Sequence, residues 1–254
     1  MYSNVIVRTP ATSLIHGLTS QTTSSPDYAQ ALVQHQHYIN ALKKGGTEVT
    51  ILPAIAEYPD ACFVEDVALL TEKIAILTRP GALTRQGEVA LIEPCIKSFY
   101  QDKITSINAP GTLEAGDILR VNNHFYIGLS KRTNQEGATQ LAAILTAYGY
   151  TSSTIELKEY LHLKTGVSYL GEGYLLVAGE LIDHPAFSSF KQIKVLPEET
   201  YAANTITINN TILMPSGFSI TSKAVEALGF NICPLAMSEF QKIDGGLSCL
   251  SLRF

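Results

Sequence analysis

The sequence predicts an α/β fold assembled from repeated units, and three observations lead to this prediction. Short apolar runs with β-branched or aromatic residues recur along the chain, each followed by a polar or Gly/Pro turn. Most of these runs precede a segment with one apolar face at helical spacing. A second series of polar motifs recurs between them at intervals of 42 to 48 positions. Intervals of this size are typical of stacked or radial arrays of supersecondary units.

Five apolar runs are predicted to form buried strands. They are residues 5–7, 74–77, 125–127, 175–177 and 212–214. Further extended runs, such as residues 49–52 and 231–233, follow the helical segments and are predicted to be additional strands.

Helical segments are predicted between these strands. The first begins at Ser25 and Pro26 and ends at Gly45, while Gly149 and Gly229 end the third and the fifth. The fourth unit, near residues 185–190, offers only a short helical segment. The apolar faces are formed by Tyr28, Leu32, Ile39 and Leu42, then Val89, Ile92, Ile96 and Phe99, then Leu141, Ile144, Leu145 and Tyr148, and finally Val225 and Leu228.

The polar motifs occupy residues 63–66, 112–117, 162–166, 201–205 and 244–249. The steps from Asp66 to Glu114, His162, Asn204 and Cys249 are 48, 48, 42 and 45 positions. Five units that close into a ring would bring these motifs to one central face. An ordinary doubly wound α/β sheet also fits alternating strands and helices, so the pattern alone leaves both architectures open.

Composition narrows the class of protein. With 254 residues, 46% hydrophobic and 16% charged, the chain predicts a packed soluble core. A net charge of −5 and no basic block predict no nucleic-acid partner. There is no apolar run of about 18 residues, which predicts no membrane partner. The N-terminus enters a strand-like run without a basic region, so no signal peptide is expected.

Cysteines and histidines give no sign of a metal site. The four cysteines form no C-x-x-C pair, and in a chain this long they predict a reducing cytoplasm and no disulfide scaffold. His35 and His37 are two positions apart on a predicted helix and therefore point in different directions. We expect neither a metal nor another cofactor.

Three residues could carry covalent chemistry. Cys249 follows Gly245 and Gly246, which permit a close approach of the backbone to a ligand. His162 has a side-chain type suited to acid–base catalysis. Glu114, among apolar and small residues, could be buried and orient that imidazole. Taken singly, a buried apolar cysteine and a satisfied core-edge histidine are the commoner explanations.

A run of acids suggests a cation site. Asp60, Glu65 and Asp66 lie among apolar residues, and carboxylates suit a guanidinium, which has five donors and keeps its charge. Arg85 and Arg132 each follow a strand and turn of the repeat. They are either surface arginines or a clamp for a substrate carboxylate.

Together these motifs resemble those of dimethylarginine dimethylaminohydrolases over the whole chain. The motifs that carry the resemblance are Phe63-Val64-Glu65-Asp66, Glu114-Ala115-Gly116-Asp117, Leu161-His162-Leu163-Lys164-Thr165-Gly166, Tyr201-Ala202-Ala203-Asn204 and Lys242-Ile243-Asp244-Gly245-Gly246-Leu247-Ser248-Cys249. The resemblance implies a single domain, residues 1–254, with the pentein fold. This fold is a five-bladed α/β propeller of five ββαβ-type repeats with pseudo-fivefold symmetry.

The resemblance also implies roles for individual residues. Cys249 would be the nucleophile, His162 the general acid/base and Glu114 its partner. The implied substrate-binding residues are Leu18, Asp60, Phe63, Glu65, Asp66, Arg85, Arg132, Ile243 and Asp244. Leu18 would lie on a lid, within the Ser/Thr-rich segment of residues 16–25. The implied substrate is a methylated L-arginine, hydrolysed to citrulline by a cytoplasmic homodimer without a metal or cofactor.

Three other activities are compatible with such a chain. An arginine deiminase usually has an extra helical domain, for which this chain is too short. An amidinotransferase would use the same cysteine, and a binding pentein would need none of the catalytic set. We expect methylated arginines to be preferred, because the acids of residues 60–66 would contact one side of the guanidinium while Phe63 offers an apolar surface.

Overall fold

The computed structural model describes residues 1–20 and 24–254. The chain divides into two compact units. The central unit is Glu65–Thr165, and the discontinuous unit combines Met1–Val64 with Gly166–Phe254. The described residues form five three-stranded sheets, each contained within one unit.

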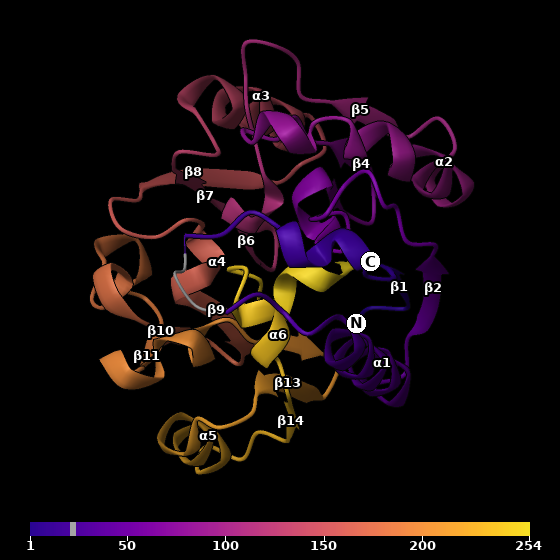
Figure 1. Ribbon diagram of the computed structural model, residues 1–254. Coiled ribbons are helices and arrows are strands. Elements are labelled where there is room, and N and C mark those ends of the chain that lie inside the picture. The colour runs from indigo at the N-terminus through magenta and orange to yellow at the C-terminus, as the bar shows by residue number, and fades with distance from the viewer. Residues whose placement is uncertain (21–23) are drawn as a thin grey trace. The chain divides into compact units, whose positions relative to one another are not determined.

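The central unit holds two sheets of identical topology (Figure 1). In the first, β4 (Ala75–Leu77) pairs antiparallel with β3 (Ala68–Leu70) and parallel with β5 (Ile104–Ser106). In the second, β7 (His124–Leu129) pairs antiparallel with β6 (Ile118–Val121) and parallel with β8 (Thr151–Glu156). The parallel connections run through α2 (Glu88–Tyr100) and α3 (Gln135–Ala147). Each sheet and its helix therefore form a ββαβ repeat.

The discontinuous unit holds the other three sheets. β10 (Tyr174–Val177) lies between β9 (Val167–Gly171) and β11 (Lys191–Lys194), and β13 (Thr211–Pro215) lies between β12 (Ile206–Ile208) and β14 (Ile232–Leu235). α5 (Ser219–Glu226) joins β13 to β14, and α6 (Ser238–Gln241) follows β14.

The remaining repeat joins both ends of the chain. β1 (Asn4–Arg8) and β2 (Glu48–Leu52) are parallel and connected by α1 (Tyr28–Lys44). The antiparallel partner of β1 is β15 (Leu252–Arg253), so the C-terminus lies beside β1 (Figure 1). The five predicted apolar runs are confirmed as the middle strands β1, β4, β7, β10 and β13.

Some predicted details are wrong, for local reasons. α1 starts later than Ser25, because Asp27 is its N-cap and accepts a hydrogen bond from the Gln30 amide at 2.9 Å. At the end of α2 the residue that enters the core is Tyr100, whose hydroxyl donates to the Thr71 carbonyl, while Phe99 is 40% exposed. Leu228 is likewise exposed, just after α5. In the fourth repeat the short helical segment expected near residues 185–190 is a 3-10 helix, Pro185–Phe187, and another lies at Gly179–Leu181.

A short helical segment, one turn long in most cases, precedes the first strand of every repeat. These turns are Val64–Val67, Ala115–Asp117, Leu163–Gly166, Pro197–Ala203 and Ser248–Leu250, before β3, β6, β9, β12 and β15 respectively. They contain or adjoin Asp66, Glu114, His162, Asn204 and Cys249. The intervals of 42 to 48 residues seen in the sequence are therefore the spacing of structurally equivalent turns.

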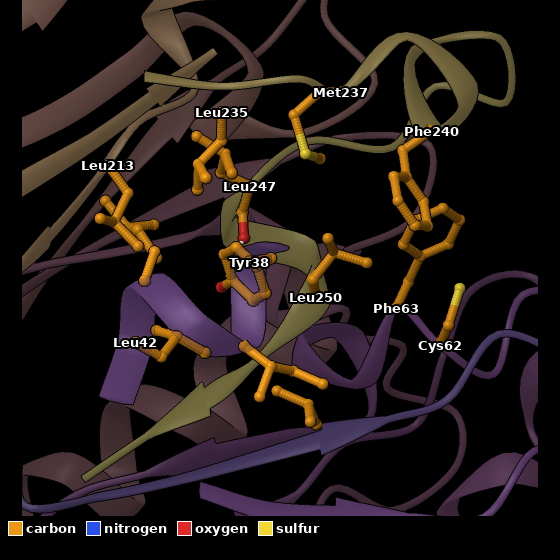
Figure 2. Close-up of a cluster of buried hydrophobic side chains, with 14 of the residues drawn as sticks. Tyr38, Leu42, Cys62, Phe63, Leu213, Leu235, Met237, Phe240, Leu247 and Leu250 are labelled. Atoms are coloured by element: carbon orange, nitrogen blue, oxygen red, sulfur yellow. Dashed lines mark hydrogen bonds between the residues drawn. The ribbon is translucent and has the colours of Figure 1, made fainter. Parts of the chain in front are cut away.

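The largest hydrophobic cluster of the discontinuous unit supports the segment that carries Cys249 (Figure 2). Tyr38 on α1 is fully buried, and its hydroxyl donates to the Leu247 carbonyl at 2.9 Å. Leu247 and Leu250, on either side of Cys249, are also fully buried. The backbone around Cys249 is thus held by core packing. In the central unit a second cluster packs α3 against its sheet through Leu141 and Leu145.

Among the described residues, none of the helices combines the length and apolar character that a membrane span requires.

Candidate active site

His162 and Glu114 form a buried hydrogen-bonded pair in the central unit. His162 precedes the helical turn before β9, and Glu114 precedes the one before β6. The Nε2 atom of His162 lies 2.7 Å from Oε2 of Glu114. Glu114 has no exposed surface, and His162 is 7% exposed. The carboxylate can therefore hold the imidazole in one orientation.

The electrostatic surroundings keep this pair charged. Burial lowers the pKa of His162, but Asp66, Asp117 and the hydrogen bond to Glu114 outweigh it and raise the pKa to about 9. Burial raises the pKa of Glu114, yet His162 and two nearby arginines hold it at about 2. At neutral pH the pair is an imidazolium and a carboxylate, so His162 can donate a proton.

Arg132 also bonds to Glu114, the carboxylate of this pair. Its Nη1 atom contacts both carboxylate oxygens of Glu114 at 3.1 Å. The Ala82 amide also donates to Oε1 of Glu114, at 3.0 Å. The side chain of Arg132 remains 19% exposed, so it is only partly enclosed.

Arg85 lies in an internal ion-pair network. It donates through Nε and Nη2 to the two oxygens of Glu88, at 3.1 and 2.9 Å, and through Nη1 to Asp66. All three side chains are about 4% exposed. A substrate carboxylate that binds Arg85 would therefore have to share it with two carboxylates of the protein.

The close approach of Asp66 to His162 depends on a glycine. The Gly116 amide donates to Oδ1 of Asp66 at 3.1 Å, and a Cβ at this position would overlap both Asp66 and the His162 ring. Donor atoms of Asp66, Glu114 and His162 lie within 4.8 Å of one another, a spacing that a metal ion could use. Arg85 and the protonated imidazole already supply the positive charge there, so a metal would have to displace both.

Glu65, next to Asp66 in sequence, forms an ion pair with Lys164. The Lys164 Nζ atom lies 2.6 Å from Oε1 of Glu65, and the two side chains are 13% and 4% exposed. Lys164 follows His162 by two positions, so this ion pair joins the turn before β3 to the turn before β9.

Sequence reasoning missed the residues that hold this network. The Asp117 carboxylate is fully buried. It accepts hydrogen bonds from the Leu163 amide at 3.0 Å and from the Ser130 hydroxyl at 2.7 Å. Ser130 in turn accepts from the Arg132 and Thr133 amides, at 3.0 and 3.2 Å. Burial raises the pKa of Asp117. The backbones beside His162 and Arg132 are thus joined through one carboxylate and one hydroxyl, and the motif Glu114–Asp117 was the available signal.

Cys249 lies in the discontinuous unit, half-buried in the turn before β15. Its Sγ atom accepts from the Gly246 amide at 3.4 Å and lies 4.0 Å from the Ser248 hydroxyl. The Asn204 side chain bonds Ser248 twice: it accepts from the backbone amide at 2.9 Å and donates to the hydroxyl at 3.1 Å.

Aromatic side chains pack against this segment. The Phe63 ring contacts Gly245, where a Cβ would overlap it, and lies edge-on to Phe240 with ring centroids 6.2 Å apart. The Tyr201 hydroxyl donates to the Gly245 carbonyl at 2.7 Å. Burial, with a smaller contribution from Cys249, raises the pKa of Tyr201. Phe63 is only 4% exposed, so it is chiefly a core residue.

Two carboxylates hold the loop that carries Leu18. Asp60 accepts from the Leu18 amide at 3.0 Å, and Asp244 accepts from the Ser20 amide at 2.6 Å. Ile243 is buried beneath Gly17. Leu18 itself is 39% exposed. Positions 21–23 of the predicted lid lie outside the described residues.

The predicted site residues are divided equally between the two units. Those of the central unit are Glu65, Asp66, Arg85, Glu114, Arg132 and His162. Ion pairs join Arg85 to Asp66 and join Glu114 to both Arg132 and His162, while Glu65 pairs with Lys164. Those of the discontinuous unit are Leu18, Asp60, Phe63, Ile243, Asp244 and Cys249.

A family model and a curated protein each match most or all of this chain. A family model described as N,N dimethylarginine dimethylhydrolase, eukaryotic, matches residues 10–237. The chain is 49% identical over 254 residues to the N(G),N(G)-dimethylarginine dimethylaminohydrolase of Pseudomonas aeruginosa, with both chains covered completely.

Solved structures match equally well. The C249S mutant of the Pseudomonas aeruginosa enzyme, complexed with citrulline, superimposes with a TM-score of 0.99 at 48% identity, and both chains are covered completely. A dimethylarginine dimethylaminohydrolase H162G adduct with S-methyl-L-thiocitrulline gives the same TM-score, identity and coverage. The predicted fold class, a five-bladed α/β propeller, is thereby confirmed, and the doubly wound alternative is excluded.

Proposed function

The chain belongs to the dimethylarginine dimethylaminohydrolase family, and from this premise we propose that it hydrolyses Nω-methylated L-arginine to L-citrulline and a methylamine. Cys249 is the nucleophile of this reaction. The observation that carries the proposal is 49% identity to a dimethylarginine dimethylaminohydrolase over the complete length of both chains.

The two solved relatives support the assignment of the reacting residues. Their substitutions, C249S and H162G, have the residue types and numbers of Cys249 and His162 in this chain. The first relative holds citrulline, which would be the product here. The second forms an adduct with a thiocitrulline derivative.

The proposed reaction proceeds in two stages. The thiolate of Cys249 adds to the guanidinium carbon, and the tetrahedral adduct expels dimethylamine as His162 protonates it. This leaves an S-alkylthiouronium on Cys249. Water then attacks the same carbon, His162 takes its proton, and release of the thiolate yields citrulline. The raised pKa of His162 suits the first stage, since the free enzyme already holds the proton that the amine needs.

The substrate-binding roles follow from exposure and charge. Asp66 and Glu65 would hold the guanidinium, together with Asp60, and limit which nitrogen is protonated. Arg132, the more exposed arginine, would bind the α-carboxylate. Arg85, enclosed between Asp66 and Glu88, would act mainly by holding Asp66 in place.

Assembly and location are proposed from family resemblance. We expect a cytoplasmic homodimer that binds a small-molecule substrate and neither nucleic acid nor membranes. The net charge of −5 supports the absence of a nucleic-acid site. Sedimentation of the purified protein at several concentrations tests the dimer.

One substrate panel tests the function. Citrulline formation is measured with dimethylarginine, monomethylarginine and arginine in one buffer. We expect kcat/KM for the methylated substrates to exceed that for arginine about ten- to a hundred-fold, because a site for a dimethylated nitrogen leaves a donor of arginine unpaired. A preference for arginine would support a deiminase, and no product from any substrate would support a binding protein. The Cys249→Ser protein controls for contaminating activity.

A further inference from the structure

Asn204 is the one member of the repeating motif series to which the proposed reaction gives no role. It caps the helical turn before β12 and is 7% exposed. Its Oδ1 atom accepts from the Ser248 amide at 2.9 Å, and its Nδ2 atom donates to the Ser248 hydroxyl at 3.1 Å. Both ends of the amide are therefore engaged by the residue before Cys249.

This arrangement decides where the Ser248 proton points. Because Oγ of Ser248 accepts a hydrogen bond from Asn204, its own hydrogen is available to another acceptor. The Sγ atom of Cys249 lies 4.0 Å from that oxygen. Ser248 is 2% exposed, so water cannot readily take the place of this acceptor.

Asn204 also packs against a second donor to Cys249, the Gly246 amide. The Gly246 amide donates to Sγ of Cys249 at 3.4 Å. The Asn204 side chain fills the space that a Cβ at Gly246 would occupy, so it packs directly on the backbone that carries this amide. One side chain thus supports the Ser248 hydroxyl and the Gly246 amide, which both lie near the sulfur.

We propose that the Ser248 hydroxyl donates a hydrogen bond to the thiolate of Cys249, and that Asn204 is the positioning residue that directs this donor. The proposal rests on the proposed function only in taking Cys249 as the nucleophile. Donors aimed at a thiolate stabilise the charged form, so they favour ionisation without an adjacent base.

An isosteric change at Asn204 separates this role from packing. In Asn204→Asp, one carboxylate oxygen still accepts from the Ser248 amide, while the other accepts where Nδ2 donated. The Ser248 hydroxyl would then turn toward the carboxylate and away from the sulfur. Ser248→Ala removes the donor outright, and Ser248→Thr retains a hydroxyl.

The test follows alkylation of Cys249 by iodoacetamide as a function of pH, without substrate, in the full-length protein. Mass spectrometry of the C-terminal peptide separates Cys249 from the other cysteines. In Ser248→Ala and Asn204→Asp we expect the midpoint of the rate profile to rise by about one pH unit, as for loss of a hydrogen bond to a charged group. In Ser248→Thr the midpoint should lie within a few tenths of a pH unit of the wild-type value. Ser222→Ala, which removes a half-buried hydroxyl on α5, should leave it unchanged.

An unchanged midpoint in Ser248→Ala would overturn the proposal, because that variant keeps Asn204 and the backbone. An equal rise in Ser222→Ala would overturn it too, since the effect would then be one of general destabilisation. Should Asn204→Asp fail to fold, the Ser248→Ala and Ser248→Thr pair decides alone. Failure of the proposed function is seen separately, as an absence of citrulline from the wild-type protein whose Cys249 midpoint still depends on Ser248.

Discussion

His162 is surrounded by charged side chains, whereas the partners of Cys249 described above are neutral. Glu114, Asp66 and Asp117 raise the pKa of His162 despite its burial. The sulfur of Cys249 faces a backbone amide and a hydroxyl instead. Both residues occupy the same place in their repeats, directly before or within the turn that leads to the first strand.

The difference follows from the charge that each side chain must bear in the proposed reaction. An imidazole that donates a proton is kept protonated by nearby carboxylates. The same carboxylates beside a thiol would oppose its ionisation, while neutral donors stabilise the thiolate. The same repeated turn therefore places His162 among carboxylates and Cys249 beside neutral donors, because the side chains around it differ.

The largest expected effect is that of Cys249→Ser. Neutral donors cannot ionise a serine hydroxyl near neutral pH, so we expect citrulline formation to fall by at least about a thousand-fold. Thermal unfolding should change little, because the cysteine is only half-buried. Cys95→Ser, on α2, is the matched control and should retain activity. More than a few per cent of residual activity in Cys249→Ser would contradict covalent catalysis.

Next in size is His162→Asn, which removes the cation at the centre of the charged region. We expect a loss in kcat of about a hundred- to ten-thousand-fold, as for loss of a general acid. In the wild type, kcat/KM should fall as the pH rises through about 9, because His162 loses its proton there. Glu114→Gln should move this limb to lower pH. If kcat/KM falls at the same pH in Glu114→Gln as in wild type, Glu114 does not set the charge of His162.

The same pKa has a consequence for stability. Since the folded-state pKa of His162 lies above 6.5, its charge stabilises the fold fully below pH 6.5, and this contribution is lost as the pH rises through about 9. Thermal unfolding of wild type from pH 6 to 10 should show this decline, and His162→Asn should lack that part of it.

The two arginines should differ because the Arg132 side chain is more exposed than that of Arg85. Arg132→Ala should raise KM about ten- to a hundred-fold through loss of a charge-assisted contact with substrate. Arg85→Ala should instead lower the free energy of unfolding by about 3–5 kcal/mol, since Asp66 and Glu88 would be left buried without their cation. The informative probe is a methylated guanidine that lacks the α-carboxylate. If wild type and Arg132→Ala discriminate equally against it, Arg132 does not bind the carboxylate.

The smallest effect is expected for Ser130→Ala, which leaves the charges in place but removes the hydroxyl between Asp117 and the Arg132 backbone. The unfolding free energy should fall by about 1–3 kcal/mol, and kcat/KM by several-fold. Thr139→Ala removes an exposed hydroxyl on α3 and serves as control. Unaltered kinetics in Ser130→Ala would mean that His162 and Arg132 are held without this connection.

The strands and the motif spacing could be predicted because their signals are local. Buried strands need apolar, β-branched runs. Gly149 and Gly229 lie shortly after α3 and α5 at positive φ, where other residues are strained. Side-chain competition at element ends was harder to predict. Whether Ser25 or Asp27 caps α1, and whether Phe99 or Tyr100 enters the core, is a difference of only one or two positions along the chain.

The sequence by itself determined which residue types recur before each first strand, because that order is part of the repeat. Only the tertiary structure decided their partners. Arg85 pairs with Asp66 across 19 positions, Glu114 with His162 across 48, and Asn204 with Ser248 across 44. Such pairings depend on how the repeats pack and on small close-approach sites such as Gly116 and Gly246. Burial then makes these contacts decisive, because a charge or amide removed from water must find its partner within the fold.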